Sequence, residues 1–144
     1  MEVFDMEENC IFCKIANGDI PSSTIYEDEM FRVILDLSPA AKGHALILPK
    51  HHMANILDIE PEVAEKVFVL ASRIAKAMKK VLKCDGINIV QNNGEVAGQT
   101  VFHFHMHIIP RYVGDGQNIN WVPGESTDEE RAEIAEAVKK AMAE

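Results

Sequence analysis

His103-Phe-His-Met-His-Ile-Ile109, inside the longer stretch from Thr100 to Arg111, places histidines at alternate positions between bulky apolar residues. Successive side chains of a strand point to opposite faces, so the stretch is predicted to be a strand with His103, His105 and His107 on one face. A helix would keep only His103 and His107 together. The aromatic and β-branched content favours a strand half-buried on its apolar side. Alternate residues lie about 6.6 Å apart along a strand, so each imidazole needs its own hydrogen-bond partner.

Length and composition predict one globular domain, residues 1–144, with residues 125–144 as a C-terminal helical extension. The chain is 47% hydrophobic and 26% charged, which is ordinary for such a domain. Its formal net charge of -9 argues against nonspecific binding to nucleic acid or anionic membranes. An acidic chain that handles phosphates must therefore build a local electropositive site from imidazoles and backbone N–H groups, with Arg111 as a further candidate.

Targeting signals and disulfides are not expected. No apolar run approaches membrane-spanning length, and residues 1–8 lack the basic flank and apolar core of a signal peptide. Three cysteines do not make a disulfide framework in a chain of this size. The pair in Cys10-Ile-Phe-Cys13 is compatible with a redox pair, a zinc half-site or two buried thiols. We therefore expect a cytoplasmic protein, in a reducing compartment, with no membrane partner.

Hydrophobic periodicity and turn residues predict the remaining elements. Apolar residues spaced by three and four predict a long amphipathic helix over residues 61–83. Shorter helices are expected at residues 10–18, with Asn9 as N-cap and a glycine at the end, and after Thr127. The other predicted strands lie at residues 23–27, 30–36, 44–49 and 87–91. The first two form a hairpin. The result is an α+β fold: a five-stranded antiparallel sheet with one long helix, a short N-terminal helix and a C-terminal helix.

The stretch from His103 to Ile109 fits the pattern His-φ-His-φ-His-φ-φ, where φ is hydrophobic, and resembles the signature of the histidine triad family. Other segments are similar to those of its branch of histidine triad nucleotide-binding proteins. They are Ile11-Phe-Cys-Lys-Ile15, Asp19-Ile-Pro21, Asp36-Leu-Ser-Pro39, Gly43-His-Ala-Leu-Ile-Leu-Pro-Lys50, Gly98-Gln-Thr-Val-Phe102 and Trp121-Val-Pro-Gly124. The resemblance covers residues 10–124 in the order of the family, so chance does not explain it.

The resemblance implies a fold and a reaction. The fold, a HIT-like five-stranded sheet, dimerises into one continuous ten-stranded sheet. The reaction is hydrolysis or transfer of a nucleoside monophosphate, from phosphoramidates, acyl nucleotides or dinucleoside polyphosphates, with purine nucleotides as substrates. The family's route passes through a covalent nucleotidyl-histidine on the middle histidine, here His105. A neutral imidazole suits that role when a hydrogen bond, commonly to a backbone carbonyl, keeps its far nitrogen protonated.

Further catalytic and binding roles follow from the resemblance. His103 and His107 complete the triad, with His107 contacting the phosphate, and the hydroxyl of Thr100 interacts with the leaving group. The loop with Asn92, Gly98 and Gln99 is expected to hold the phosphate oxygens, because glycine lets main chain approach a ligand closely. Asp36 would accept hydrogen bonds from the ribose, and the alternative is a plain turn-starting aspartate. The apolar slot around the base has five candidates, which a plain core would contain as well: Ile11, Phe12, Ile15, Phe31 and Ile34.

The resemblance also implies a structural zinc ion. Some members of the family, and the related galactose-1-phosphate uridylyltransferases, hold zinc on two cysteines, an upstream histidine and the first triad histidine. The matching residues here are Cys10, Cys13, His52 and His103. Two thiolates and two imidazoles satisfy tetrahedral zinc. His52 is preferred to His51 because the family's Pro-Lys-x-His pattern places the ligand there.

Two features depart from the family pattern. Residues 124–144 add an acidic helix that the short members lack, and Pro110-Arg111 follows the triad where that branch often has glycines. Outside the proposed sites, Cys84 is expected to be structural and His44 a core or edge histidine.

Two other functions stay open. The histidines would bind a catalytic metal that activates water, or the protein would be a nucleotide-binding regulator whose turnover is incidental. Chelation separates the first of these from the leading hypothesis, because loss of a structural zinc would cost mainly stability.

Overall fold

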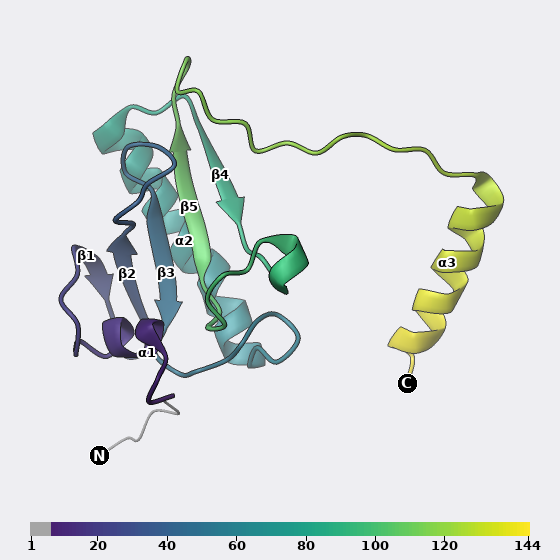
Figure 1. The fold of residues 1–144 in the computed structure, drawn as a ribbon, viewed down its shortest axis with the longest axis horizontal. Helices are drawn as coiled ribbons and strands as arrows, with labels where there is room; N and C mark the ends of the chain where they lie inside the picture. The colour runs from purple at the N-terminus through teal and green to yellow at the C-terminus, as the bar shows by residue number, and fades with distance from the viewer. Residues whose placement is uncertain (1–6) are drawn as a thin grey trace.

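Five strands form one antiparallel sheet in the computed structural model, which describes residues 7–144. They are β1 Thr24–Glu27, β2 Phe31–Leu35, β3 Ala45–Pro49, β4 Gly86–Val90 and β5 Met106–Arg111. Their order in the sheet is β1-β2-β3-β5-β4, and every neighbouring pair is antiparallel. Within this part of the chain the α-helices are α1 Ile11–Ala16, α2 Pro61–Leu82 and α3 Asp128–Met142 (Figure 1). The predicted α+β fold is confirmed, and most of the segment examined for a signal peptide lies outside the described residues.

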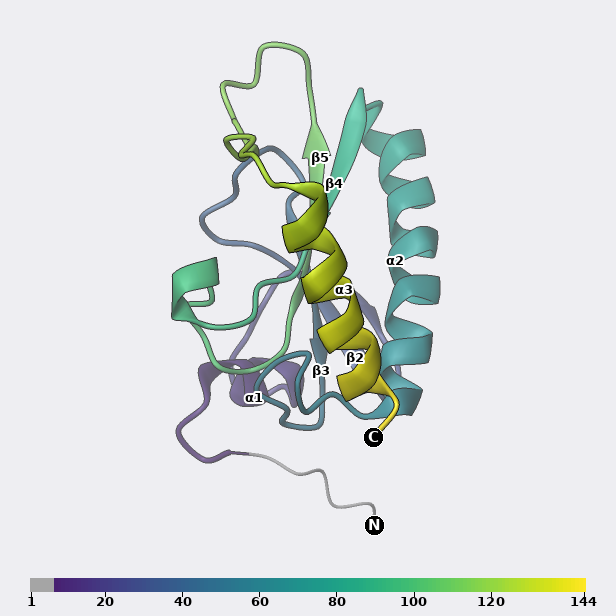
Figure 2. The same ribbon diagram turned by 90° about the vertical axis from the view of Figure 1, so that its right-hand side faces the viewer.

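The sheet separates two faces with different covers (Figure 2). β3, in the middle, is buried on both, as its unbroken apolar run predicts. Ala45 and Ile47 join the main hydrophobic core beneath α2, whereas Leu46 and Leu48 join a smaller cluster with α1. The short α1 covers only part of its face, so room is left there for a site.

Helix α2 is amphipathic as predicted. It begins at Pro61, because proline at the first helical position has no N–H to satisfy, and ends where Lys83 takes a left-handed φ of 54°. Its buried stripe is Val63, Val67, Leu70, Ala71, Ile74 and Met78. Further apolar residues remain exposed on its other side: Phe68 (61%), Val69 (64%) and Val81 (76%).

Helix α1 begins differently from the prediction. Asn9 is not the N-cap; Cys10 is, and its Sγ accepts a hydrogen bond from the N–H of Cys13 at 3.4 Å. The sulfur replaces the usual capping oxygen because the turn folds the two cysteines toward each other. The predicted glycine end is correct, with Gly18 at φ +85° just beyond the helix.

The strand predicted from Thr100 to Arg111 is only half correct, because β5 begins at Met106 and the residues before it are irregular. Met106 is where the ladder with β3 stops. Before that point, the N–H of Phe104 donates to the carbonyl of Met53 at 2.6 Å, and Met53 lies outside the sheet. A loop partner therefore takes the place of a strand partner.

The histidine side of this stretch is also more buried than predicted. His103 is fully buried and His105 is 7% exposed, while Phe104 and Met106 on the other side are buried as well. The stretch is therefore covered on both sides, by α1 and its cysteines on one and by the core under α2 on the other.

Helix α3 stands away from the sheet at the end of an extended connection, residues 112–127 (Figure 1). Thr127 caps it as predicted, because its Oγ1 accepts a hydrogen bond from the N–H of Glu130 at 3.1 Å. Every residue from Asp128 to Met142 is exposed. Among residues 7–144, no helix is both long and apolar enough to cross a bilayer.

Arg111 is engaged at the end of β5. It donates to both carboxylate oxygens of Asp115, at 2.8 and 2.9 Å, and this pairing holds the pKa of Asp115 well below its usual range. It also donates to Asn88 at 2.9 Å. Arg111 lies four residues beyond His107, roughly 13 Å along a strand. The expectation that it adds positive charge to the histidine face is therefore wrong.

Candidate active site and metal cluster

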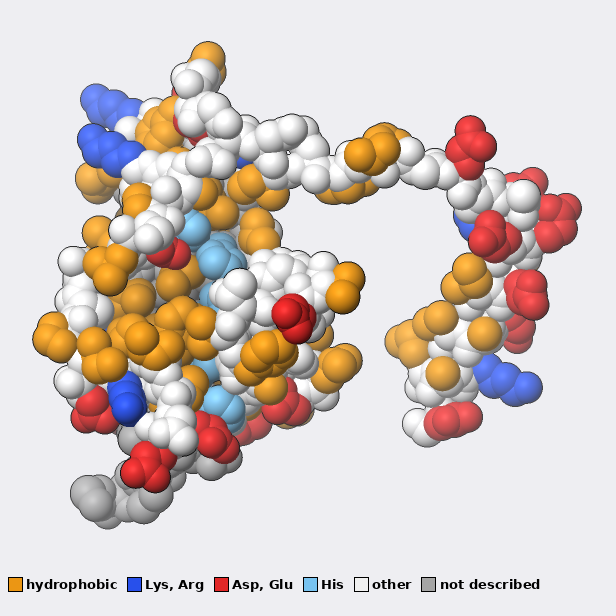
Figure 3. All heavy atoms as spheres, in the orientation of Figure 1, with side chains coloured by type: hydrophobic (Ala, Val, Ile, Leu, Met, Phe, Trp, Pro, Cys, Tyr) orange, Lys and Arg blue, Asp and Glu red, His pale blue; other side chains and the backbone are white. Residues whose placement is uncertain are grey.

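Four imidazoles line the face of the sheet that α1 partly covers. His107 lies on β5 opposite Leu46 of β3, and His44 immediately precedes β3. His103 and His105 come from the irregular segment before β5. Ring centroids are 5.0 Å apart between His105 and His107 and 5.2 Å apart between His44 and His107. Figure 3 shows histidine side chains along this face, flanked by hydrophobic ones.

His105 is held in one tautomer. Its Nδ1 lies 2.7 Å from the carbonyl oxygen of His103. A carbonyl only accepts, so Nδ1 carries the proton and Nε2 keeps its lone pair. The ring of Phe12 from α1 packs edge-on against this imidazole, with centroids 4.9 Å apart. His105 is thus a positioned, neutral imidazole with a nucleophilic nitrogen.

A second pair of imidazoles is ordered by the backbone. The N–H of Ala40 donates to Nδ1 of His44 at 3.0 Å. In a neutral His44 the proton is then on Nε2, which lies 2.9 Å from Nδ1 of His107. His107 therefore accepts at Nδ1 and carries its proton on Nε2. Where His105 offers a lone pair, His107 offers a hydrogen-bond donor.

His44 was expected to be a core or edge histidine, and it is indeed buried and hydrogen-bonded. That expectation missed its second role, which is to select the tautomer of His107. The available signal was its position on an otherwise apolar run, because a buried polar side chain there needs a specific partner.

Burial keeps the imidazoles neutral. It lowers the pKa of His103 and of His107 to about 4, because a buried imidazolium loses its hydration. Burial also lowers the pKa of His105 and His44, and the nearby Asp36 carboxylate opposes that effect. At neutral pH the face therefore presents N–H groups and lone pairs, so the expected electropositive character does not come from imidazolium charge.

Asp36 lies directly after β2 and has two contacts. Its Oδ1 accepts a hydrogen bond from the N–H of Ser38 at 2.8 Å, as in the turn that was the alternative interpretation. Its Oδ2 lies 3.8 Å from Nε2 of His44. The turn therefore aims one carboxylate oxygen at the histidine face, where it can accept from a ligand hydroxyl.

Gln99 braces the loop between β4 and β5. Its side-chain amide donates to the carbonyls of Ala54 and Val101 at 2.7 and 3.1 Å, and its Oε1 accepts from the N–H of Gly94 at 2.8 Å. Its own N–H donates back to the carbonyl of Gly94 at 3.0 Å. Every donor of Gln99 is thus used within the protein, and the bond to Ala54 ties the loop to the segment after β3.

Gly98 ends the short 3-10 helix η1, Glu95–Ala97, with φ +99°, and its N–H donates to the carbonyl of Glu95 at 2.9 Å. A Cβ there would lie 3.4 Å from Nδ2 of Asn92, so glycine lets the two segments approach. Among the residues that the structure describes, the side-chain amide of Asn92 and the N–H of Thr100 have no hydrogen-bond partner. These two are among the loop donors available to a ligand.

Thr100 and the apolar candidates fall in different places. Phe12, Ile15 and Ile34 pack together in the small cluster on the α1 face. Thr100 and the half-exposed Ile11 border a shallow depression of about 390 Å³ beside Cys10 and His52.

Phe31 points to the other face of the sheet, into the main core under α2, so its inclusion in the base slot is wrong. Because alternate residues of β2 face opposite ways, Phe31 cannot share a face with Ile34.

Cys10, Cys13, His52 and His103 bring four donor atoms within 4.8 Å of one another. Nδ1 of His103 is 3.5 Å from Sγ of Cys10 and 3.4 Å from Sγ of Cys13, and Nδ1 of His52 is 3.3 Å from Sγ of Cys13. Tetrahedral zinc, with Zn–S near 2.3 Å and Zn–N near 2.0 Å, has S···N edges of about 3.5 Å. The donor atoms therefore already stand at the corners that such an ion requires.

The surroundings of the cluster also suit a cation. The ring of His103 donates from Nε2 to the carbonyl of Pro49 at 2.8 Å, which leaves the Nδ1 lone pair facing the sulfurs. The N–H of Glu7 donates to Sγ of Cys13 at 3.4 Å. Burial raises the pKa of the Cys13 thiol to about 11, so the thiol is protonated at neutral pH when no metal is bound. A soft divalent cation would bind it as a thiolate.

These features define a class of protein: an α+β domain that holds neutral histidines on the open face of an antiparallel sheet and braces them with a Cys/His cluster. A family model described as HIT domain matches residues 17–114. The chain belongs to the HIT family, and the resemblance noted from the sequence is confirmed.

Several relatives carry names that describe an activity or a family. The chain is 50% identical over 115 residues to "Protein hit" of Bacillus subtilis, covering 79% of each chain. It is 43% identical to adenosine 5'-monophosphoramidase HNT1 of Saccharomyces cerevisiae, covering 85% of this chain and 75% of that one. It is 40% identical to adenylylsulfatase HINT3 of Arabidopsis thaliana, covering 77% and 56%.

Solved structures match the whole chain. The crystal structure of SMU.412c from Streptococcus mutans has a TM-score of 0.91 at 42% identity, covering 99% of this chain and 90% of that one, so the match includes α3. A zinc-bound histidine triad family protein from Mycobacterium smegmatis has a TM-score of 0.73 at 39% identity, covering 94% and 98%.

Proposed function

We propose that this protein is a nucleotidyl hydrolase or transferase that cleaves the bond between a nucleoside 5'-phosphate and its leaving group through His105. One observation carries the proposal. Nδ1 of His105 donates a hydrogen bond to the carbonyl of His103, so Nε2 keeps its lone pair free to attack. The names of the phosphoramidase and adenylylsulfatase relatives support the same reaction class. Purine nucleotides linked to an amine, an acyl group, sulfate or a second nucleotide are the proposed substrates.

The reaction would have two steps. Nε2 of His105 attacks the α-phosphorus, a P–N bond forms, and the bond to the leaving group breaks with its electron pair on the leaving group, which takes up a proton. Water then attacks the same phosphorus and the nucleoside monophosphate departs, which restores neutral His105. The proton stays on Nδ1 throughout, donated in a hydrogen bond to the carbonyl of His103, so that carbonyl stabilises the imidazolium of the intermediate.

Other residues would position the substrate. His107 would donate from Nε2 to a phosphate oxygen, and the Asn92 amide and Thr100 N–H would be further donors. The Thr100 hydroxyl would serve the leaving group, with Gly98 and Gln99 shaping the loop. Asp36 would accept from the ribose. The base would lie against the apolar residues Ile11, Phe12, Ile15 and Ile34.

We propose that Cys10, Cys13, His52 and His103 hold a structural zinc ion, which would supply folding energy by joining α1 to the loop after β3 and to the triad. The zinc-bound mycobacterial structure supports this assignment. Reduced cysteines, in turn, favour a cytoplasmic location.

We also propose a homodimer with a continuous ten-stranded sheet. β4 is an edge strand, and an unpaired edge offers free N–H and C=O groups to another strand. Phe68 and Val81 of α2 and Ile89 of β4, which is 39% exposed, offer exposed apolar surface for the same contact. The domain would span residues 1–144 with residues 125–144 as its helical extension.

A second candidate is a metal-dependent hydrolase, favoured by the second group of donor atoms within 4.8 Å, from Asp36, His44 and His107. The hydrogen bonds argue against it, because His44 and His107 already use a nitrogen on each other and His44 uses its other nitrogen on Ala40.

Turnover of a substrate panel tests the proposal. The protein is expected to release AMP from adenosine 5'-phosphoramidate, adenylyl sulfate or a diadenosine polyphosphate, because all three place a good leaving group on an adenylyl phosphorus. Product chromatography measures this, with AMP itself as the inert control. Release of AMP from none of them overturns the proposal, and activity that a chelator stops before the fold is lost favours the metal-dependent alternative.

A variant of His44 tests the tautomer chain. Replacing His44 with leucine is expected to lower kcat/KM about 10- to 100-fold, because His107 would lose the donor that selects its tautomer. His44→Gln is the matched control, since its amide can accept from Ala40 and donate to His107, and it should recover most of the rate. If leucine and glutamine give equal rates, His44 does not act through its hydrogen bonds.

A further inference from the structure

Helix α3 is amphipathic and has no partner in the chain. One face carries Ile134, Val138 and Met142, which are 56%, 51% and 81% exposed. Figure 3 shows this hydrophobic side turned toward the space beside the body, with charged side chains on the outer side. Helices of about fifteen residues are marginal in water without tertiary packing. Its apolar face therefore requires a surface to cover it.

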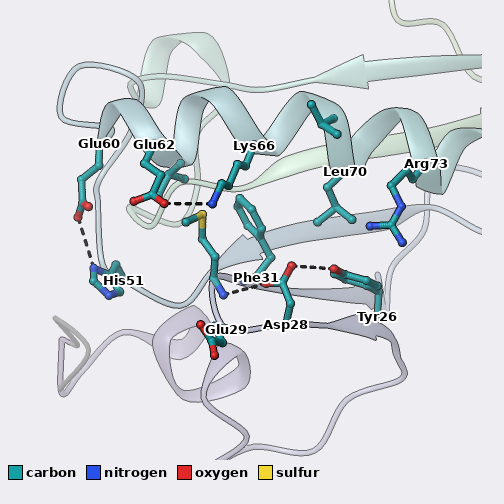
Figure 4. A pocket seen from close by; sticks show the side chains of 13 residues that line it. Tyr26, Asp28, Glu29, Phe31, His51, Glu60, Glu62, Lys66, Leu70 and Arg73 are labelled. Carbon is teal, nitrogen blue, oxygen red and sulfur yellow. Dashed lines mark hydrogen bonds and ion pairs between the residues drawn. The ribbon is translucent and has the colours of Figure 1, made fainter. Parts of the chain in front are cut away.

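The same chain has an unfilled groove of suitable shape. It has a volume of about 600 Å³ and runs along α2, on the side of the turn between β1 and β2 (Figure 4). Its lining is mixed: Met30 and Val69 are apolar and accessible, Phe31, Val63 and Leu70 are apolar and nearly buried beneath them, and Asp28, Glu29 and Lys66 also line it.

The two ends of the groove differ in charge. Glu60 and Glu62 lie at one end, where α2 begins, and Arg73 lies at the other, where Asp28 also accepts a hydrogen bond from Tyr26 (Figure 4). The guanidinium of Arg73 packs over the ring of Tyr26, 5.3 Å from its centroid, so the positive charge is held in place.

We propose that α3 of a second copy of this chain docks along this groove. The lengths agree, because α2 rises about 20 Å from Glu60 to Arg73 and a helix of 15 residues is about 22 Å long. One orientation pairs opposite charges. In it, the acidic first turn of α3 lies near Arg73. The basic last turn, with Lys139 and Lys140, lies near Glu60 and Glu62. Apolar side chains then cover the floor of the groove.

The position of α3 favours a second copy over the chain's own groove. α3 stands beyond the β4 edge, and its apolar side faces the space next to that edge, whereas the groove lies at the opposite, β1 side of the sheet (Figures 1 and 3). Residues 112–127 can span roughly 50 Å when extended, and five strands of a neighbouring sheet are only about 24 Å wide. Two copies related by a two-fold axis would exchange both helices reciprocally. The match to the Streptococcus mutans structure covers 99% of this chain, α3 included.

Cysteine cross-linking between two differently tagged full-length chains tests the proposal. One chain carries Val138→Cys on the apolar face of α3, and the other carries Lys66→Cys, where Lys66 is 58% exposed on the rim of the groove. The two are coexpressed, oxidised with glutathione disulfide and separated on a non-reducing gel. Glu136→Cys, on the outer face of α3, is the matched control, and the parent chain measures background from native cysteines.

The expected result is a disulfide between the two tagged chains that is about tenfold more abundant with Val138→Cys than with Glu136→Cys, because docking gives a millimolar effective concentration. Three results would overturn the proposal: equal yields from both positions, no disulfide with either, or a link that forms only within one chain carrying both Val138→Cys and Lys66→Cys. The readout does not depend on turnover, so it stands apart from the proposed reaction.

Discussion

Replacement of His105 by asparagine is expected to reduce AMP release by about four orders of magnitude or more, as loss of a covalent nucleophile does in other enzymes. Asparagine can still donate to the carbonyl of His103 in place of Nδ1, so the loop should keep its shape. What the variant lacks is a lone pair positioned at the phosphorus. Steady-state rates on adenosine 5'-phosphoramidate measure the loss.

The covalent step has its own readout. Intact-protein mass spectrometry, after rapid quenching without acid, is expected to find an adenylyl adduct on the parent chain and none on the His105→Asn variant. His51→Asn is the matched control, because Nδ1 of this histidine lies 3.4 Å from Oε1 of Glu60 and its side chain lines the groove along α2, not the histidine face. A His105→Asn variant that turns over within about tenfold of the parent rate would disprove the nucleophile assignment, since a nucleophile's loss costs far more.

Removal of zinc is expected to lower stability more than any single surface change. A ligand present at about a thousand times its Kd stabilises the folded state by about 4 kcal/mol, and this amount is lost when a chelator takes the metal. Cys13→Ala should have the same effect without a chelator, because it removes a buried thiolate that lies near both histidine ligands. Thermal unfolding and metal analysis of the purified chain measure the two effects together.

Cys84→Ala is the matched control for that experiment. Cys84 is as fully buried as Cys13 but lies at the end of α2, outside the cluster. Both substitutions remove one sulfur atom, so their difference isolates the metal from packing. Cys13→Ala should lose the bound zinc and its response to chelator, whereas Cys84→Ala should keep both. Equal destabilisation, with zinc retained in both variants, would show that the cysteines only fill space.

Elements that depend on local pattern were predictable. α2 buries the apolar positions that recur by three and four, and β3 is buried on both faces as its apolar run requires. Both outcomes follow from periodicity within one segment. The start of β5 was not predictable in this way, because its pairing with β3 begins only at Met106, although β3 itself continues to Pro49, and the N–H of Phe104 binds Met53, a residue far off in the sequence.

The candidate site likewise has features that the sequence predicts and features that only the structure shows. The residue types, three alternating histidines and a Cys-x-x-Cys pair, are visible in the sequence and identify the chemistry. The hydrogen bonds of Gln99 to Ala54 and Val101, and of the Gly98 N–H to Glu95, were not visible in the sequence, because they depend on how the chain folds around this loop. Alternation alone puts Phe31 and Ile34 on opposite faces of β2, but only the packing of the helices shows which of those faces carries the histidines.

By itself, the sequence determined the family, the order of elements and the set of atoms that can attack phosphorus or hold a metal, because these depend on residue type and short spacing. Tertiary structure alone decided which nitrogen of His103 and of His107 carries the proton, whereas His105 is held by a carbonyl only two residues away. The partner of His107 is His44, 63 residues away, and the partner of His103 is a carbonyl 54 residues away. A tautomer is set by the hydrogen bond on the other nitrogen, and such bonds exist only once distant segments have packed together.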